Sequence, residues 1–185
     1  AVERLIEMGL ALGCSISSWN RFARKNYFYP DLPKNYQISQ YEEPVATTGK
    51  FSFFSSNEKK TVGITRIHLE EDAASNIHEG DFSLIDFNRA GMPLMELVTE
   101  PVMHDAKTAG DFARELQLLL RYLGASEASM EKGQMRLEAN VSISKDETLG
   151  TKVEVKNINS FRALEKTIEY EIKRQIEVLE AGEKI

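Results

Sequence analysis

The chain has 185 residues, enough for one domain of ordinary size, and its 42% hydrophobic content excludes a disordered or collagen-like chain. The 29 acidic and 23 basic side chains leave a net charge of −6, which argues against a protein that holds nucleic acid chiefly by bulk positive charge. A single cysteine excludes a disulfide framework, and no apolar run is long enough to span a membrane. We therefore expect a folded protein of a reducing compartment that does not enter a membrane.

The first part of the chain is predicted to be a helix followed by an irregular segment. Residues 2–12 carry apolar side chains at helical spacing, and Gly13 is a suitable end for that helix. Residues 19–41 are rich in aromatic and basic side chains and are interrupted by Pro30 and Pro33. We interpret them as an ordered, basic, aromatic loop.

The middle of the chain is predicted to be β-structure. Residues 51–54 and 61–71 are typical of two strands of a hairpin, with residues 57–60 as its polar turn. Residues 83–87 are predicted to form a further strand that ends in a turn over residues 88–93.

The last part is predicted to contain two helices and a second hairpin. Asp105 is a good N-cap for a helix that ends at Gly124, and residues 160–181 carry an apolar stripe at helical spacing. Between them, residues 135–144 and 152–155 are predicted to pair as strands. Strands and helices do not alternate as in βαβ units, so the sequence favours an α+β domain with a largely antiparallel sheet and flanking helices.

The stretch RKNYFYPDLPKNYQISQ, residues 24–40, is the first candidate for function. Its cations suit phosphates and its tyrosine rings suit stacking on a base or sugar. The alternative is a packed surface loop whose aromatics fill the edge of a core. The residues leave both interpretations open.

The stretch RIHLEED, residues 66–72, is the second candidate. Side chains alternate along a strand, so Glu71 is expected to point the same way as Ile67 and Leu69. An inward carboxylate needs a cation or donors, which makes Glu71 the better ligand candidate of the run. An exposed acidic strand end is the alternative, and His68 alone is predicted to be structural rather than a ligand.

The second predicted hairpin is the third candidate. Alternation places Glu138 and Glu154 on one sheet face, with Arg136, Asn140 and Lys156 as neighbours. Two acids beside cations and an amide suit a hard metal together with a phosphate, whereas the alternative is a cross-strand ladder of ion pairs. No P-loop and no serine-nucleophile or zinc-protease motif occurs, so any catalysis is expected to rely on carboxylates, a divalent cation and positioning.

At these same residues the chain resembles the B subunit of the aspartyl/glutamyl-tRNA(Asn/Gln) amidotransferases and, more distantly, the archaeal E subunit. The matching stretches occur in the family's order over nearly the whole chain. They are RKNYFYPDLPKNYQISQ, GITRIHLEEDA, DFNRAGMPLMELVTEP, MEKGQMRLEANVSIS, KVEVKNINSF and EYEIKRQ.

The resemblance implies the catalytic cradle domain of an ATP- and Mg²⁺-dependent carbon–nitrogen ligase that uses glutamine as amide donor. Such an enzyme phosphorylates the side-chain carboxyl of Glu-tRNA(Gln) or Asp-tRNA(Asn), and ammonia released by the amidotransferase's A subunit then forms the amide. The implied partners are the A and C subunits in a heterotrimer, in bacterial cytoplasm or an organellar matrix. Residues 1–185 are expected to be part of that domain, without the family's N-terminal strand and its C-terminal helical and tail domains.

The resemblance also assigns residues. Glu71 and Glu154 match family Mg²⁺ ligands, and Glu138 matches a position where Asp is commoner. Lys25 and Tyr27 match residues that line the place where ammonia meets the activated substrate. Residues that contact ATP and the choice between Glu-tRNA and Asp-tRNA stay open. The alternative function is a non-catalytic RNA-binding or scaffold module that retains the fold.

Overall fold

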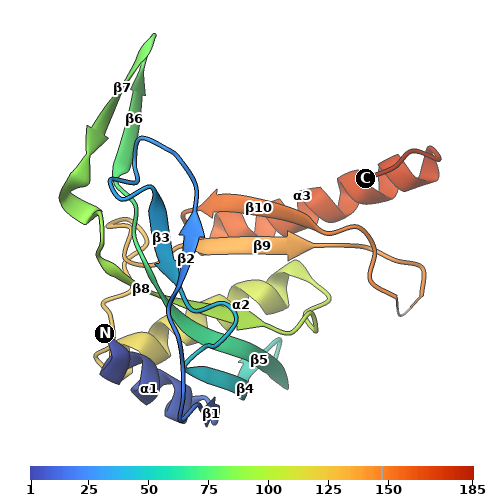
Figure 1. Ribbon diagram of the computed structural model, residues 1–185. Coiled ribbons are helices and arrows are strands. Elements are labelled where there is room, and N and C mark those ends of the chain that lie inside the picture. Colours follow the sequence, from blue (N-terminus) through green and yellow to red (C-terminus); the bar gives the residue numbers. More distant parts are fainter. Residues whose placement is uncertain (147) are drawn as a thin grey trace. The chain divides into compact units, whose positions relative to one another are not determined.

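The computed structural model describes residues 1–146 and 148–185 (Figure 1). These residues divide into two compact units, each of which is described by itself. The first contains Ala1–Phe51 and Thr61–Pro101, and the second contains Ser52–Lys60 and Val102–Ile185. Both contain helix and antiparallel strand pairs, which confirms the predicted α+β class.

A four-stranded sheet is the main β-structure. Its strand order is β1-β4-β5-β8, and the helix α1 precedes it in the chain. The bounds are α1 Val2–Ala11, β1 Ser15–Ile16, β4 Ala46–Ser55, β5 Glu58–Glu71 and β8 Pro93–Thr99. Leu5 and Met8 of α1 are almost fully buried, as the predicted apolar face requires, whereas Leu10 is exposed.

The segment predicted as a loop contains a short hairpin. Strands β2 (Ala23–Asn26) and β3 (Tyr36–Ser39) pair antiparallel, with Lys25 opposite Gln37. The loop prediction was therefore wrong for these eight positions, because four-residue strands with polar side chains carry almost no periodic signal.

The turn between β4 and β5 lies earlier than predicted. It consists of Ser56 and Asn57, with φ angles of 50° and 67°, and β5 begins at Glu58. Two consecutive positive φ angles are typical of the tight two-residue hairpin turn, and asparagine tolerates them well. Asn57 thus lies in the turn as predicted, whereas residues 58–60 begin the longest strand of the sheet.

A second hairpin joins β6 (Ser75–Glu79) to β7 (Phe82–Asp86). Strand β7 confirms the predicted strand at residues 83–87, whereas β6 and β8 were not predicted. A short 3₁₀ helix, η1 (Phe87–Arg89), occupies the predicted turn before β8.

The second unit contains both predicted long helices. Helix α2 spans Ala106–Tyr122 and α3 spans Phe161–Glu180. The side chain of Asp105 accepts a hydrogen bond from the amide of Thr108 at 2.7 Å, as the N-cap prediction requires. Within the described part of the chain, no helix is long and apolar enough to cross a membrane.

Strands β9 (Leu137–Val141) and β10 (Val153–Ile158) form the predicted second hairpin, with α3 packed along it (Figure 1). The buried core of this unit draws on α2, both strands and α3. Its members are Ala113, Ala139, Val141, Ile158 and Leu164. The opposite, polar face of the hairpin is therefore left to carry Glu138 and Glu154.

Candidate functional site

Glu71 is the last residue of β5 and is only 9% exposed. Both of its carboxylate oxygens lie 2.6 Å from Nζ of Lys34, which belongs to the loop between β2 and β3. The backbone amide of Ile38 donates a further hydrogen bond to Oε1 at 2.9 Å. Strand alternation thus correctly predicted a buried Glu71, and the charge is stabilised by an ammonium group and an amide.

The neighbouring Glu70 has a separate set of partners on the other face of the strand. Its Oε1 accepts a hydrogen bond from Ser39 at 3.0 Å and lies 3.3 Å from Nε2 of His68. Burial raises the pKa of Glu70, but the hydrogen bonds from His68 and Ser39 outweigh burial and bring it below its usual value. Glu70 is therefore held as a carboxylate.

Lys25 and Tyr27, the two residues predicted to act on substrate, are electrostatically coupled to Glu70. The charge of Lys25 helps to lower the pKa of Glu70. The pKa of Tyr27 is raised by burial and by the negative charges of Asp31 and Glu70. Tyr27 thus remains a neutral hydroxyl that can donate a hydrogen bond. Both predicted residues lie near Glu70, and their roles toward substrate stay predictions.

The basic, aromatic segment both packs and exposes side chains. The guanidinium of Arg24 lies 4.7 Å and the ammonium of Lys34 lies 4.9 Å from the ring centre of Tyr36. Leu32 is buried, whereas Phe28 is 84% exposed. Part of this segment is therefore packed, and ligand binding by its exposed side chains stays a prediction.

Glu138 and Glu154 lie on the same face of the β9–β10 hairpin, as alternation predicts. Lys156 joins them, with Nζ 3.5 Å from one carboxylate oxygen of each. Burial lowers the pKa of Lys156, but the combined effect of the two glutamates is larger, so the pKa of Lys156 lies above its usual value. Lys156 is therefore held in its ammonium form between two carboxylates.

The Mg²⁺ ion that the resemblance implies fits this second pair better than it fits Glu71. The side chains of Glu138 and Glu154 are 48% and 43% exposed and offer the oxygen ligands that Mg²⁺ prefers. The two oxygens of Glu71 are already bound to Lys34, so a metal there would have to displace an ammonium group. Glu71 belongs to the first unit and the pair to the second. The convergence of all three remains a prediction.

The structure also brings together three side chains that sequence reasoning did not combine. One ligand atom each of His68, Glu70 and Glu96 lies within 4.8 Å of the others. Alternation along β5 already places His68 and Glu70 on one face. The sequence did not reveal Glu96, because it lies opposite His68 only through the pairing of β5 with β8, two strands that are distant in sequence.

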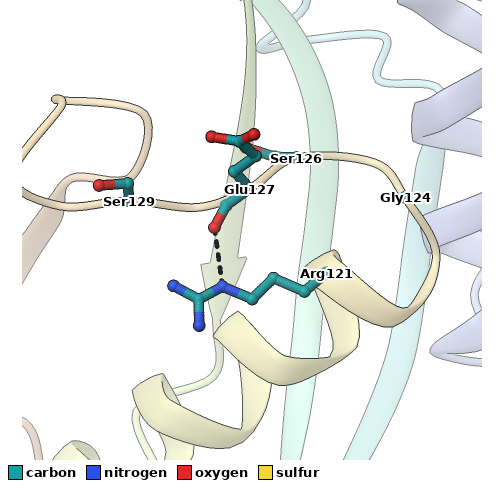
Figure 2. Close-up of a pocket in the computed structure, with 5 residues that line it drawn as sticks. All are labelled: Arg121, Gly124, Ser126, Glu127 and Ser129. Carbon is teal, nitrogen blue, oxygen red and sulfur yellow. Dashed lines mark hydrogen bonds between the residues drawn. The ribbon is translucent and has the colours of Figure 1, made fainter.

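A shallow hollow of about 440 Å³ lies at the C-terminal end of α2 in the second unit. Figure 2 shows Arg121 beneath Glu127, with its Nε donating to the carbonyl oxygen of Glu127 at 2.7 Å. Gly124, Ser126 and Ser129 complete the lining. None of the predicted site residues lines this hollow. Its arginine, Arg121, is hydrogen-bonded to the backbone of the loop that follows α2.

Comparison with known proteins bears on the whole chain. The family model described as the GatB/GatE catalytic domain matches residues 1–185. The chain belongs to this family. Relatives named as the B subunit of aspartyl/glutamyl-tRNA(Asn/Gln) amidotransferase include those of Variovorax paradoxus at 54% identity, Thermodesulfovibrio yellowstonii at 52% and Bdellovibrio bacteriovorus at 51%. Each alignment covers 100% of this chain and 39 to 40% of the relative, so the chain spans about two fifths of their length.

Proposed function

We propose that this chain is part of the catalytic cradle domain of an ATP- and tRNA-dependent amidotransferase. The match of the catalytic-domain family model to all 185 residues carries the proposal. The names of the relatives support the substrates, Glu-tRNA(Gln) and Asp-tRNA(Asn). The proposed reaction is a glutamine-hydrolysing carbon–nitrogen ligation.

The chemistry proceeds in two steps. A carboxylate oxygen of the tRNA-bound Glu or Asp takes the γ-phosphoryl group of ATP, and ADP leaves. Ammonia then attacks the carbonyl carbon of the acyl phosphate, loses a proton and expels inorganic phosphate, which leaves the amide. Phosphoryl transfer needs charge neutralisation and alignment more than covalent help, so cations and carboxylates suffice for the first step.

The side chains of the first unit supply positioning. Lys25 is an exposed cation that suits the substrate carboxylate or the phosphoryl group formed on it. Tyr27, kept neutral by burial and by nearby negative charge, offers a hydroxyl that can orient ammonia. Glu70 holds negative charge near both residues: Lys25 helps to lower the pKa of Glu70, and Glu70 helps to raise the pKa of Tyr27.

The second unit supplies the residues for the metal. Glu138 and Glu154 are the residues that would hold Mg²⁺, which when bound neutralises charge on the transferring phosphoryl group. Lys156 lies between the two carboxylates and limits their mutual repulsion. A longer side chain at Glu138 than the commoner Asp of the family reaches further from the strand.

The remaining assignments follow from the family. The A subunit of the amidotransferase is proposed to release ammonia from glutamine, and the C subunit to complete a heterotrimer with it. The bacterial cytoplasm or an organellar matrix is the proposed location. We propose that the family's N-terminal strand completes the catalytic site and that its C-terminal helical and tail domains bind tRNA.

The test is amide formation by the full-length protein assembled with its partner subunits. We expect ATP- and glutamine-dependent conversion of Glu-tRNA(Gln) to Gln-tRNA(Gln) or of Asp-tRNA(Asn) to Asn-tRNA(Asn). Lys25→Ala should lower turnover, whereas the surface control Lys50→Ala should not. Binding of tRNA without any amide product would instead identify a non-catalytic RNA-binding module and reject the proposal.

A further inference from the structure

Strand β10 contains one residue more than its partner strand β9 at a single point. The regular pairing of β10 stops at Val155 and resumes at Ile158, whereas β9 advances by only two residues over the same stretch. Two residues of β10, Lys156 and Asn157, therefore lie opposite one residue of β9, Glu138. This is a β-bulge, a feature that bends its strand and is over-represented next to active sites.

Asn157 has the backbone conformation that marks the bulge. Its φ angle is 61°, in the left-handed region, and the residue is exposed. Asparagine and glycine adopt this region readily, whereas a β-branched residue is strained there. A single residue within β10 therefore interrupts an otherwise extended strand.

The core of the hairpin does not explain the bulge. Ile158 follows it, belongs to the buried core of the second unit and is 5% exposed. Without Asn157, Lys156 would precede Ile158 directly, and the run V-E-V-K-I would alternate between the two faces with its present partners in β9. Burial of Ile158 therefore does not need the extra residue, whose effect falls on the outward face of the hairpin.

The outward face at the bulge carries the Glu138–Glu154 pair. Nζ of Lys156 lies 3.5 Å from a carboxylate oxygen of Glu138 and 3.5 Å from one of Glu154. Hydrogen bonds between an ammonium group and a carboxylate are usually shorter, about 2.7 to 2.9 Å. Lys156 thus stays near both carboxylates without forming a short bond to either, and both glutamates remain accessible.

The bulge accounts for this loose arrangement. In a regular ladder, Lys156 would be the sole residue opposite Glu138, and directly opposed side chains of opposite charge pair closely. The bulge divides that position between Lys156 and Asn157 and adds twist to β10. The separation between the lysine and the carboxylates is therefore set by the backbone of β10.

We propose that Asn157 is a positioning residue: the bulge that it forms holds Lys156 between Glu138 and Glu154 while leaving their oxygens available to a divalent cation. This inference rests on the proposed function of the Glu138–Glu154 pair and identifies the feature of β10 that sets its geometry. The left-handed backbone of Asn157 carries the effect, so its side-chain amide is dispensable.

The test deletes Asn157 from the full-length protein assembled with its partner subunits. The deletion closes the bulge and retains Lys156 and both glutamates. We expect the Mg²⁺ concentration that half-saturates ATP binding to rise at least about tenfold, as for loss of a residue that orients metal ligands. The midpoint of thermal unfolding should be unchanged or higher, because the strand becomes regular. A residue that served stability alone would lower this midpoint instead.

Two substitutions at Asn157 separate its backbone from its side chain. Asn157→Gly retains the left-handed conformation and should keep the Mg²⁺ dependence within about twofold of wild type. Asn157→Val disfavours that conformation and should behave as the deletion does. These two variants decide the question if circular dichroism shows that the deletion does not fold. The matched control is Asn57→Val, since Asn57 also has a positive φ, of 67°, but lies in the β4–β5 turn. It should lose stability without a change in Mg²⁺ dependence.

Two results would overturn the inference. One is a wild-type Mg²⁺ dependence in folded Asn157→Val or in the folded deletion variant. The other is an Asn157→Gly variant as weak as Asn157→Val, which would assign the effect to the side-chain amide. Wild-type protein that binds ATP with Mg²⁺ but forms no amide would reject the proposed function and leave the role of the bulge standing.

Discussion

Two adjacent glutamates of one strand have different environments. Glu71 binds Lys34 and a backbone amide, whereas Glu70 faces His68 and Ser39. The alternation of a strand separates them onto opposite faces, so consecutive acids in HLEED can serve separate purposes. At the scale of single residues, partners rather than residue type decide what each carboxylate does.

The Lys34–Glu71 pair is expected to stabilise the first unit. Lys34→Ala removes the ammonium and leaves a mostly buried carboxylate with the amide of Ile38. Because Lys34 is 40% exposed and water can replace part of its contact, we expect a loss of about 1 to 2 kcal/mol in the free energy of unfolding. Urea denaturation measures it. Equal losses in wild-type and Glu71→Gln backgrounds would show that the two side chains are not coupled.

Glu70 is expected to make stability depend on acid pH. The pKa of Glu70 in the folded protein lies below its ordinary value of 4.5, because the His68 and Ser39 hydrogen bonds outweigh burial. Its contribution is therefore complete above about pH 4.5 and is lost as pH falls through the lower folded value. Urea unfolding between pH 6 and pH 3 should show a shallower acid loss for Ser39→Ala. If the free energy of unfolding of Ser39→Ala fell with pH in parallel with that of wild type, Glu70 would not make this contribution.

At the scale of elements, helices are defined by local signals and strand pairs are not. Asp105 and Ser160 each cap the helix that follows by accepting an amide hydrogen bond, and Gly124 has a φ of 62° where α2 ends. These features depend on residues a few positions apart, and the Asp105 cap and the Gly124 end were predicted correctly. Strand β8 depends on its pairing with β5 and was missed.

The cap of α2 is expected to contribute measurably to stability. Asp105→Ala removes the acceptor for the amide of Thr108, at an expected loss of about 1 kcal/mol in the free energy of unfolding. Asp105→Asn retains a carbonyl acceptor and should lose much less. Thermal and urea unfolding of both variants would measure the difference. Equal destabilisation would mean that the charge, rather than the hydrogen bond, supports the helix.

At the scale of the whole molecule, the predicted Mg²⁺ ligands come from both compact units. Glu71 lies in the first unit, and Glu138 and Glu154 lie in the second. The family resemblance predicts that the three carboxylates hold one ion, and a thermodynamic cycle tests this prediction.

The cycle compares Mg²⁺-dependent ATP binding in the full-length protein with Glu71→Gln, Glu138→Gln and the double variant. If the two carboxylates share one ion, each single variant should weaken binding, and the double variant should be little weaker than the worse single one. Equilibrium binding of ATP at fixed Mg²⁺ provides the measurement. Strictly additive losses would place the two residues in independent sites.

The sequence by itself determined the helices, the Asp105 cap, the α+β class, the buried position of Glu71 and the shared face of Glu138 and Glu154. The helices, the cap and the face on which each glutamate lies follow from spacing within one helix or one strand, where the chain's own geometry sets which side chains share a face. Only the tertiary structure decided that Lys34, 37 residues away in sequence, binds Glu71, and that Glu96 lies opposite His68. Pairing across strands depends on register, which residues distant in sequence set jointly.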